Sequence, residues 1–173
     1  MSGISGRPEA TEHAPYYARY VALVEGHDVL SALELSTRET EALLRSITEE
    51  RSHHRYAAEK WSLREVFVHI TDVERVFAYR ALRVARGDET PLEGFDPDSW
   101  MHRAGADARQ WADIAREVES VRAATLTLFH SLPPDAWTRA GTADDNPVTV
   151  RAVAFMIAGH EIHHRQVIAS KYL

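Results

Sequence analysis

Four stretches of the sequence repeat apolar residues at the three- and four-residue spacing of an amphipathic helix. They cover about residues 28–50, 62–86, 107–131 and 149–171, and charged residues fill the positions between the apolar ones. No strand-like alternation of convincing length and no internal repeat accompanies them. Because each apolar stripe must be buried against another helix, the sequence predicts an all-α fold, a four-helix bundle with long crossover loops.

The second of these helices has the clearest boundaries. Ser62 can cap its first turn while Glu65 reaches back to the cap, and Gly87 supplies a stop after the last apolar position. Two long connections, residues 88–106 and 135–147, link the second helix to the third and the third to the fourth. Aromatic residues in the first connection indicate that it packs on the bundle.

Length and composition fit one globular domain. The 173 residues can bury a core, so we expect a domain over residues 16–173 after a flexible segment over residues 1–15. The net charge of -6 argues against nucleic acid or an anionic membrane as a partner. No apolar run reaches the roughly 18 residues of a membrane span. We therefore expect a cytoplasmic protein that acts on a small-molecule substrate.

Metal-binding residue types concentrate near the C-terminus. His160 and His164 lie four residues apart on one face of the fourth helix, so two ring nitrogens can reach one cation. Two ligands do not hold a metal tightly, and His69, on the apolar stripe of the second helix, can supply the third. We predict a divalent metal on His69, His160 and His164, with one position open for water or substrate. The alternative is that His69 is a hydrogen-bonded core histidine.

Glu161 allows three interpretations. Because His160-Glu161-Ile162-His163-His164 fits the pattern His-Glu-x-x-His, Glu161 is a candidate catalytic base. It could instead accept a hydrogen bond behind the metal ligands or form an ion pair with Arg165. A metalloprotease is the weakest interpretation, because only nine residues follow His164 and no strand is predicted to bind a peptide.

Two further residues are candidates for binding a cofactor. Arg80 lies near the stripe of His69 and needs a carboxylate partner, failing which it would bind an anion in the pocket. Trp100, together with Trp61 and Trp137, could line that pocket, although large aromatic residues more often serve plain packing. His163 is expected at or beyond the edge of the buried face. The remaining histidines considered are expected at the surface: His13, His53, His54, His102 and His130.

Three segments resemble the DinB/YfiT-like superfamily. They are Lys60-Trp61-Ser62-Leu63-Arg64-Glu65-Val66 with His69-Ile70, then Glu74-Arg75-Val76-Phe77-Ala78-Tyr79-Arg80-Ala81-Leu82, and Gly159-His160-Glu161-Ile162-His163-His164. The resemblance extends from about Tyr16 to Tyr172, and the order of the three histidines matches. It implies a four-helix bundle with a divalent metal, often nickel or zinc, on His69, His160 and His164. With the aromatic residues of the long loops, it also implies a homodimer.

The resemblance further implies a class of reaction. Members with known activity are largely transferases or isomerases that use glutathione-like thiols such as bacillithiol or mycothiol, and others are described as metal-dependent hydrolases. We expect first a thiol-dependent S-transferase acting on small electrophiles, in which the metal holds a low-molecular-weight thiol as thiolate. The chain has no cysteine, so the nucleophilic sulfur would arrive with the cofactor. A hydrolase, with Glu161 taking a proton from water, and a non-catalytic metal- or ligand-binding protein are the alternatives.

Overall fold

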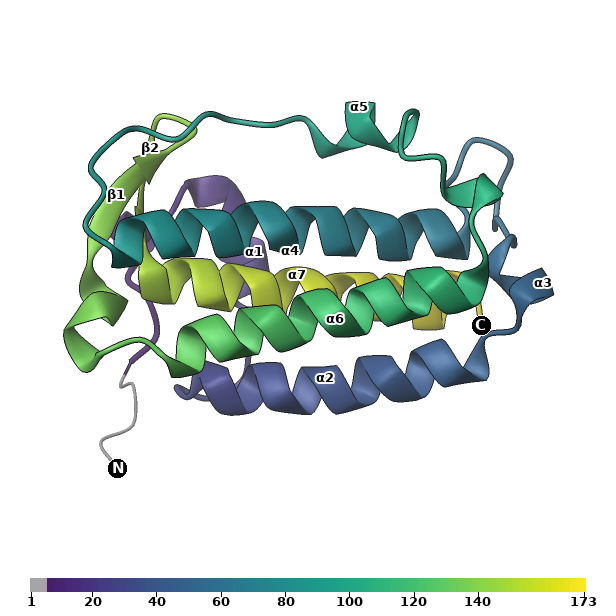
Figure 1. The fold of residues 1–173 in the computed structure, drawn as a ribbon, viewed down its shortest axis with the longest axis horizontal. Coiled ribbons are helices and arrows are strands. Elements are labelled where there is room, and N and C mark those ends of the chain that lie inside the picture. The colour runs from purple at the N-terminus through teal and green to yellow at the C-terminus, as the bar shows by residue number, and fades with distance from the viewer. Residues whose placement is uncertain (1–5) are drawn as a thin grey trace.

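The computed structural model describes residues 6–173. Four long helices run lengthwise through the molecule (Figure 1): α2 Val29–Ser46, α4 Leu63–Ala85, α6 Trp111–His130 and α7 Val150–Lys171. Helices α4 and α2 each contact both α6 and α7, which closes the bundle. The predicted all-α bundle is thus confirmed. Among residues 6–173, no helix combines the length and the apolar character needed to cross a membrane.

Shorter elements precede α2 and fill the connections between the long helices. They are the 3-10 helices η1 Ala10–Glu12, η2 Pro15–Tyr17, η3 Ala106–Ala108 and η4 Pro134–Thr138, the helices α1 Ala18–Val21, α3 Glu49–Ser52 and α5 Pro97–Met101, and the strands β1 Ala140–Ala143 and β2 Asn146–Thr149. The connection that carries α5 runs over α4 along the upper edge of Figure 1.

Side-chain caps fix where the long helices begin. Ser62 and Glu65 form the predicted capping box, with Glu65 N donating to Ser62 Oγ at 3.3 Å and Ser62 N donating to Glu65 Oε2 at 2.7 Å. Asp28 and Thr149 accept hydrogen bonds from backbone N–H groups in the first turns of α2 and α7. These caps satisfy donors that a helix N-terminus otherwise leaves unpaired.

The connection over residues 135–147 leads into a short hairpin that the sequence did not predict. Strands β1 and β2 pair antiparallel, and four residues each are too few to show a recognisable alternation. Asp144 and Asp145 form the turn with φ of 53° and 57°, the left-handed conformation that a two-residue hairpin turn requires. Leu92 joins from the other crossover loop, donating to Thr142 O and accepting from Asp144 N, both at 2.9 Å. The two long loops are therefore tied together.

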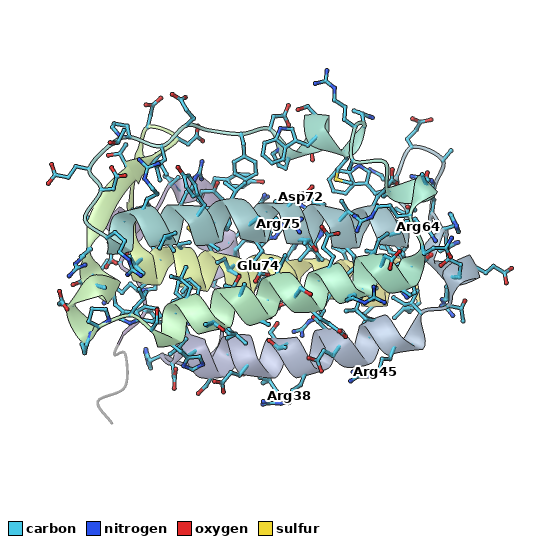
Figure 2. All side chains as sticks on the ribbon, viewed as in Figure 1. Arg38, Arg45, Arg64, Asp72, Glu74 and Arg75 are labelled. Atoms are coloured by element: carbon cyan, nitrogen blue, oxygen red, sulfur yellow. The ribbon has the colours of Figure 1, made fainter. Side chains whose placement is uncertain are left out.

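Helix α7 is the centre of the bundle, and every residue from Ala152 to Glu161 is buried. Apolar packing divides into two clusters, one around Phe77 and Phe155 and the other around Phe67 and Trp111. On α7, the first cluster ends at Ala158 and the second contains Ile168, so the histidines lie between them. Figure 2 shows that charged side chains occupy both environments: Arg38 and Arg45 project outward from α2, whereas Glu74 faces the other helices. A buried polar layer thus separates two apolar halves.

Residues 6–15, part of the segment expected to be flexible, dock on the bundle through specific contacts. Glu12 accepts hydrogen bonds from Thr149 Oγ1 at 2.6 Å and from Arg151 Nε at 2.7 Å. His13 is 5% exposed, so its predicted surface location is wrong. Residues 1–5 of that segment lie outside the described part of the chain.

Gly159 allows α1 to approach α7 closely, and replacing it with alanine should be costly. An added Cβ would lie 1.9 Å from the backbone oxygen of Tyr20. We expect Gly159→Ala to lower the free energy of unfolding by about 2–3 kcal/mol, measured by urea denaturation, because α1 must move away. Ser170→Ala, at an exposed position of the same helix, is the control and should change stability by less than about 0.5 kcal/mol. A Gly159→Ala variant as stable as its control would contradict the close approach.

Candidate metal centre

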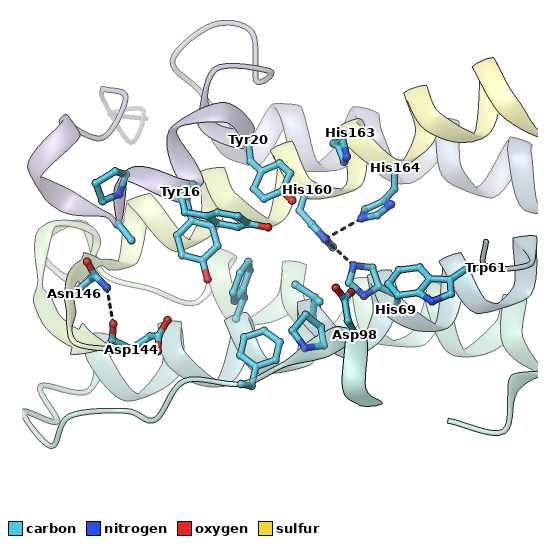
Figure 3. Close-up of a pocket in the computed structure, with 17 residues that line it drawn as sticks. Tyr16, Tyr20, Trp61, His69, Asp98, Asp144, Asn146, His160, His163 and His164 are labelled. Carbon is cyan, nitrogen blue, oxygen red and sulfur yellow. Dashed lines mark hydrogen bonds between the residues drawn. The ribbon is translucent and has the colours of Figure 1, made fainter. Parts of the chain in front are cut away.

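The three predicted ligands meet at one point between α4 and α7 (Figure 3). His69 Nε2 and His164 Nε2 each lie 3.1 Å from His160 Nε2. One ligand nitrogen from each ring lies within 4.8 Å of the others. His160 and His164 meet because they are one helical turn apart, and the packing of α4 on α7 brings His69 to them.

This arrangement of nitrogens fits a shared cation better than a network of imidazole hydrogen bonds. Metal–imidazole bonds of about 2.0–2.1 Å at tetrahedral angles put two ligand nitrogens roughly 3.3 Å apart. A neutral ring nitrogen carries either one hydrogen or one lone pair, so His160 Nε2 cannot serve both neighbours well as a hydrogen-bond partner. His69 Nδ1 is buried and has no hydrogen-bond partner among residues 6–173. The alternative of a hydrogen-bonded core histidine accounts for His69 Nε2, which lies 3.1 Å from His160 Nε2, but not for the unpartnered Nδ1.

Burial keeps these rings neutral, as metal ligands must be. It lowers the pKa of His69 to about 4 and that of His164 to about 3, with neighbouring histidines adding to the effect. Burial also lowers the pKa of His160 far below its ordinary value. At neutral pH all three lone pairs are available to a cation.

The same pKa values predict how the metal-free protein responds to acid. Histidine in the unfolded chain has a pKa near 6.5, so below that pH the unfolded chain binds protons that the folded His69 and His164 do not bind. The contribution of these residues to the free energy of unfolding should therefore change little above pH 6.5 and fall as the pH drops below it. The loss is about 2 kcal/mol at pH 5 for either residue taken singly.

Urea denaturation of chelator-treated protein between about pH 7 and pH 5 measures this loss. Carboxylates such as Glu12, whose pKa Arg151 helps to lower to about 2, act at lower pH. His69→Gln should make the dependence less steep. A stability that does not change over this interval would contradict the burial of neutral rings.

The histidines lie at one end of a pocket of about 610 Å³. Aromatic side chains form most of its wall: the Trp61 ring lies 4.8 Å from the His69 ring, and the Tyr20 ring packs edge-on against His160 at 5.3 Å. Phe77 and Phe95 also line the pocket. The ligand set is thus open to a small molecule on one side.

Glu161 is turned away from this pocket. It is 2% exposed and accepts hydrogen bonds from Ser36 Oγ and Thr40 Oγ1, both at 2.5 Å, and from Arg122 Nη1 at 2.7 Å. Arg122 also donates to both carboxylate oxygens of Glu74, at 2.9 and 2.8 Å. Burial would raise the pKa of Glu161, but the Arg122 guanidinium and the two hydroxyls hold it below its ordinary value. Glu161 is therefore an ionised structural group.

Two interpretations of Glu161 need correction. A carboxylate with three buried donors that does not line the pocket is not placed to act as the catalytic base. The ion pair with Arg165 is wrong, because Arg165 pairs with Glu39 at 2.7 Å and Glu161 with Arg122. The sequence showed that Glu161 borders the buried face, but it could not show which helix would cover it.

The candidate cofactor-binding residues also lie outside the pocket lining. Arg80 donates to Glu93 O at 2.6 Å and has no carboxylate within 4.0 Å among residues 6–173. Its guanidinium lies 5.2 Å from the Phe95 ring centre and borders a small adjoining cavity rather than the pocket itself. Trp100 is 41% exposed and packs against Phe95 with ring centres 5.2 Å apart, and Trp137 is buried against Phe129. Of the three tryptophans considered, Trp61 lines the pocket.

The pocket contains functional candidates that the sequence did not indicate. Figure 3 shows the Asp98 carboxylate pointing from α5 toward the His69 ring. His163, half-buried beside His164, and Tyr20 also line the pocket. A single aspartate in a loop carries no sequence signal, and only the path of the loop over α4 brings Asp98 to the pocket.

Comparison with known proteins supports the architecture. YfiT from Bacillus subtilis, described as "a probable metal-dependent hydrolase with an unusual four-helix bundle topology", matches with a TM-score of 0.66 at 15% sequence identity. The match covers 96% of this chain and 91% of that chain, and at this identity it shows the fold. A search of functionally curated proteins gives no match. Residues 32–168 match the sequence model of the DinB superfamily, and the chain therefore belongs to that superfamily.

Proposed function

We propose that the protein is a metal-dependent hydrolase that acts on a small molecule. The observation that carries this proposal is the convergence of three neutral imidazole nitrogens at one end of an open pocket. His69, His160 and His164 would hold a divalent cation there, and the cation would supply Lewis acidity toward a carbonyl group and a water molecule. Imidazole ligands suit zinc and nickel, among other metals. The description of YfiT as a metal-dependent hydrolase supports the same reaction class.

Asp98 is the residue that we assign to proton transfer. It lines the pocket and points toward His69, so it can accept a proton from the attacking water and return it to the leaving group (Figure 3). Tyr20 has a different role. Burial raises its pKa to about 12, so its hydroxyl stays neutral while its ring holds His160 in place. The aromatic wall excludes water from the rest of the substrate.

The test is hydrolysis of an ester, amide and lactone panel by protein stripped of metal and reloaded with zinc or nickel. We expect turnover only after reloading. Asp98→Asn should lower kcat at least about 100-fold while leaving the bound metal unchanged. Glu89→Gln, an exposed acid in the same loop, is the matched control and should keep full activity. An unchanged kcat in Asp98→Asn would show that Asp98 does not transfer the proton. If no compound of the panel is hydrolysed in a metal-dependent way, the proposed function is wrong.

A thiol-dependent S-transferase is the second candidate. The absence of cysteine favours it, because a sulfur nucleophile would have to enter the pocket with a cofactor. Conjugation of low-molecular-weight thiols to epoxides and halides, measured with the same reloaded protein, separates the two reactions. A non-catalytic metal-binding protein is less well supported, because a sensor site is expected to be closed and this pocket is open to a ligand.

A further inference from the structure

The pocket has a second polar end, opposite the histidines, which the proposed reaction does not use. Asp144 and Asn146 reach it from the turn between β1 and β2 (Figure 3). We propose that this end binds a protonated primary amine carried by the substrate. The inference rests on the proposed function and narrows its substrate class to small apolar esters or amides with an amino group at the far end.

The first support is the charge that a ligand would contact. The residues lining the pocket include two carboxylates, Asp98 and Asp144, and no lysine or arginine. Arg19 lies nearby, but its guanidinium stacks 4.0 Å from the Tyr16 ring centre and donates to the Tyr20 hydroxyl. Arg80 donates to Glu93 O and borders a small adjoining cavity together with Asn146, but it does not line the pocket itself. The charged side chains that line the pocket are therefore carboxylates, and neither guanidinium group is among the lining residues.

The second support is the excess of hydrogen-bond acceptors. No group among residues 6–173 donates to the Asp144 carboxylate or pairs with it as an ion. The Asn146 amide nitrogen donates to the backbone oxygen of Asp144, which leaves Asn146 Oδ1 as an acceptor. A primary ammonium group offers three donors and no acceptor, so it complements this end of the pocket.

The third support is the way the backbone fixes Asp144. A Cβ at Gly94 would lie 2.1 Å from Asp144 Oδ1, so the missing side chain makes room for the carboxylate. The backbone N–H of Asp144 donates to Leu92 O at 2.9 Å. The next residue, Asp145, has the same left-handed turn conformation and is exposed like Asp144, but it does not line the pocket. Asp145 is therefore a matched control.

The apolar lining of the pocket determines what the rest of the ligand must be. Val73 and Phe77 follow His69 at four-residue steps on the same face of α4, and together with Phe95 they line the pocket without offering a charge or a hydrogen-bonding group. A substrate that spans the pocket would place its ammonium group at Asp144, an apolar section along these side chains, and its hydrolysable bond at the histidines.

The test is calorimetric binding of phenylalkylamines with chains of one to five methylene groups to the metal-loaded protein. The corresponding alcohols and carboxylates serve as neutral and anionic comparisons. We expect one or more amines to bind about ten-fold more tightly than the matched alcohol and carboxylate. Asp144→Asn should weaken amine binding about ten-fold, whereas Asp145→Asn should leave it unchanged.

The inference is overturned if no amine binds at millimolar concentration, if the carboxylates bind as tightly as the amines, or if the two aspartate variants behave alike. Binding is measured without turnover, so the inference and the proposed function can fail separately. Amine binding that depends on Asp144, without any hydrolysis, would support the ammonium subsite and contradict the hydrolase function. Hydrolysis with no preference for an amino group would support the hydrolase function and contradict the ammonium subsite.

Discussion

Replacing Arg122 with alanine is expected to destabilise the fold by about 3–5 kcal/mol, measured by urea denaturation. The Arg122 guanidinium lies between the carboxylates of Glu74 and Glu161, and all three side chains are buried. Without it, two ionised carboxylates would remain in the interior with no opposite charge. Each must then be protonated or hydrated, and both outcomes open the packing among the helices.

Arg116→Ala is the control for this prediction. Arg116 lies on the same helix and forms an ion pair with Asp113, but its side chain is 74% exposed. Water screens an exposed pair, so the expected loss is below about 0.5 kcal/mol. If Arg122→Ala cost no more than its control, the buried layer would not be a stabilising part of the fold.

His164→Ala is expected to remove most of the bound metal, whereas His163→Ala retains it. His164 Nε2 faces His160 Nε2 at 3.1 Å, while His163 is no member of the converging set. Three ligands hold a divalent cation far better than two, so the loss of one should release it on dialysis. Elemental analysis of both variants, with circular dichroism to confirm folding, gives the result. Equal metal loss in the two variants would show that the ligand set is wrong.

The fold could be predicted because its signals are local. Apolar periodicity and the capping box of Ser62 and Glu65 lie within single helices, and they indicated the bundle and the start of α4. The first and third predicted helices were too long, because α2 ends at Ser46 and α6 begins at Trp111. The hairpin could not be predicted in the same way. Its strands are four residues long, and its pairing with Leu92 depends on a loop about 50 residues earlier in the sequence.

In the candidate site, too, the residues recognised from the sequence are those whose relation is local to one helix. The spacing of His160 and His164 fixes their common face, so the ligand pair could be recognised from the sequence. The partner of Glu161 could not, because a helical wheel shows which face is buried but not which side chain covers it. Arg122 and Glu74 come from two other helices, and neither differs in sequence from an ordinary surface charge. Asp98 was missed because only its loop position brings it to the pocket.

The most direct test of the metal centre is X-ray absorption spectroscopy of the zinc- or nickel-loaded protein, compared with the same measurement on His160→Ala. His160 is the central residue, because its Nε2 lies 3.1 Å from the Nε2 atoms of both other histidines. We predict about three imidazole nitrogens at roughly 2.0–2.1 Å from the metal, together with oxygen ligands, and loss of this signal in the variant. A spectrum without imidazole scattering, or an unchanged spectrum in His160→Ala, would contradict a metal held by His69, His160 and His164.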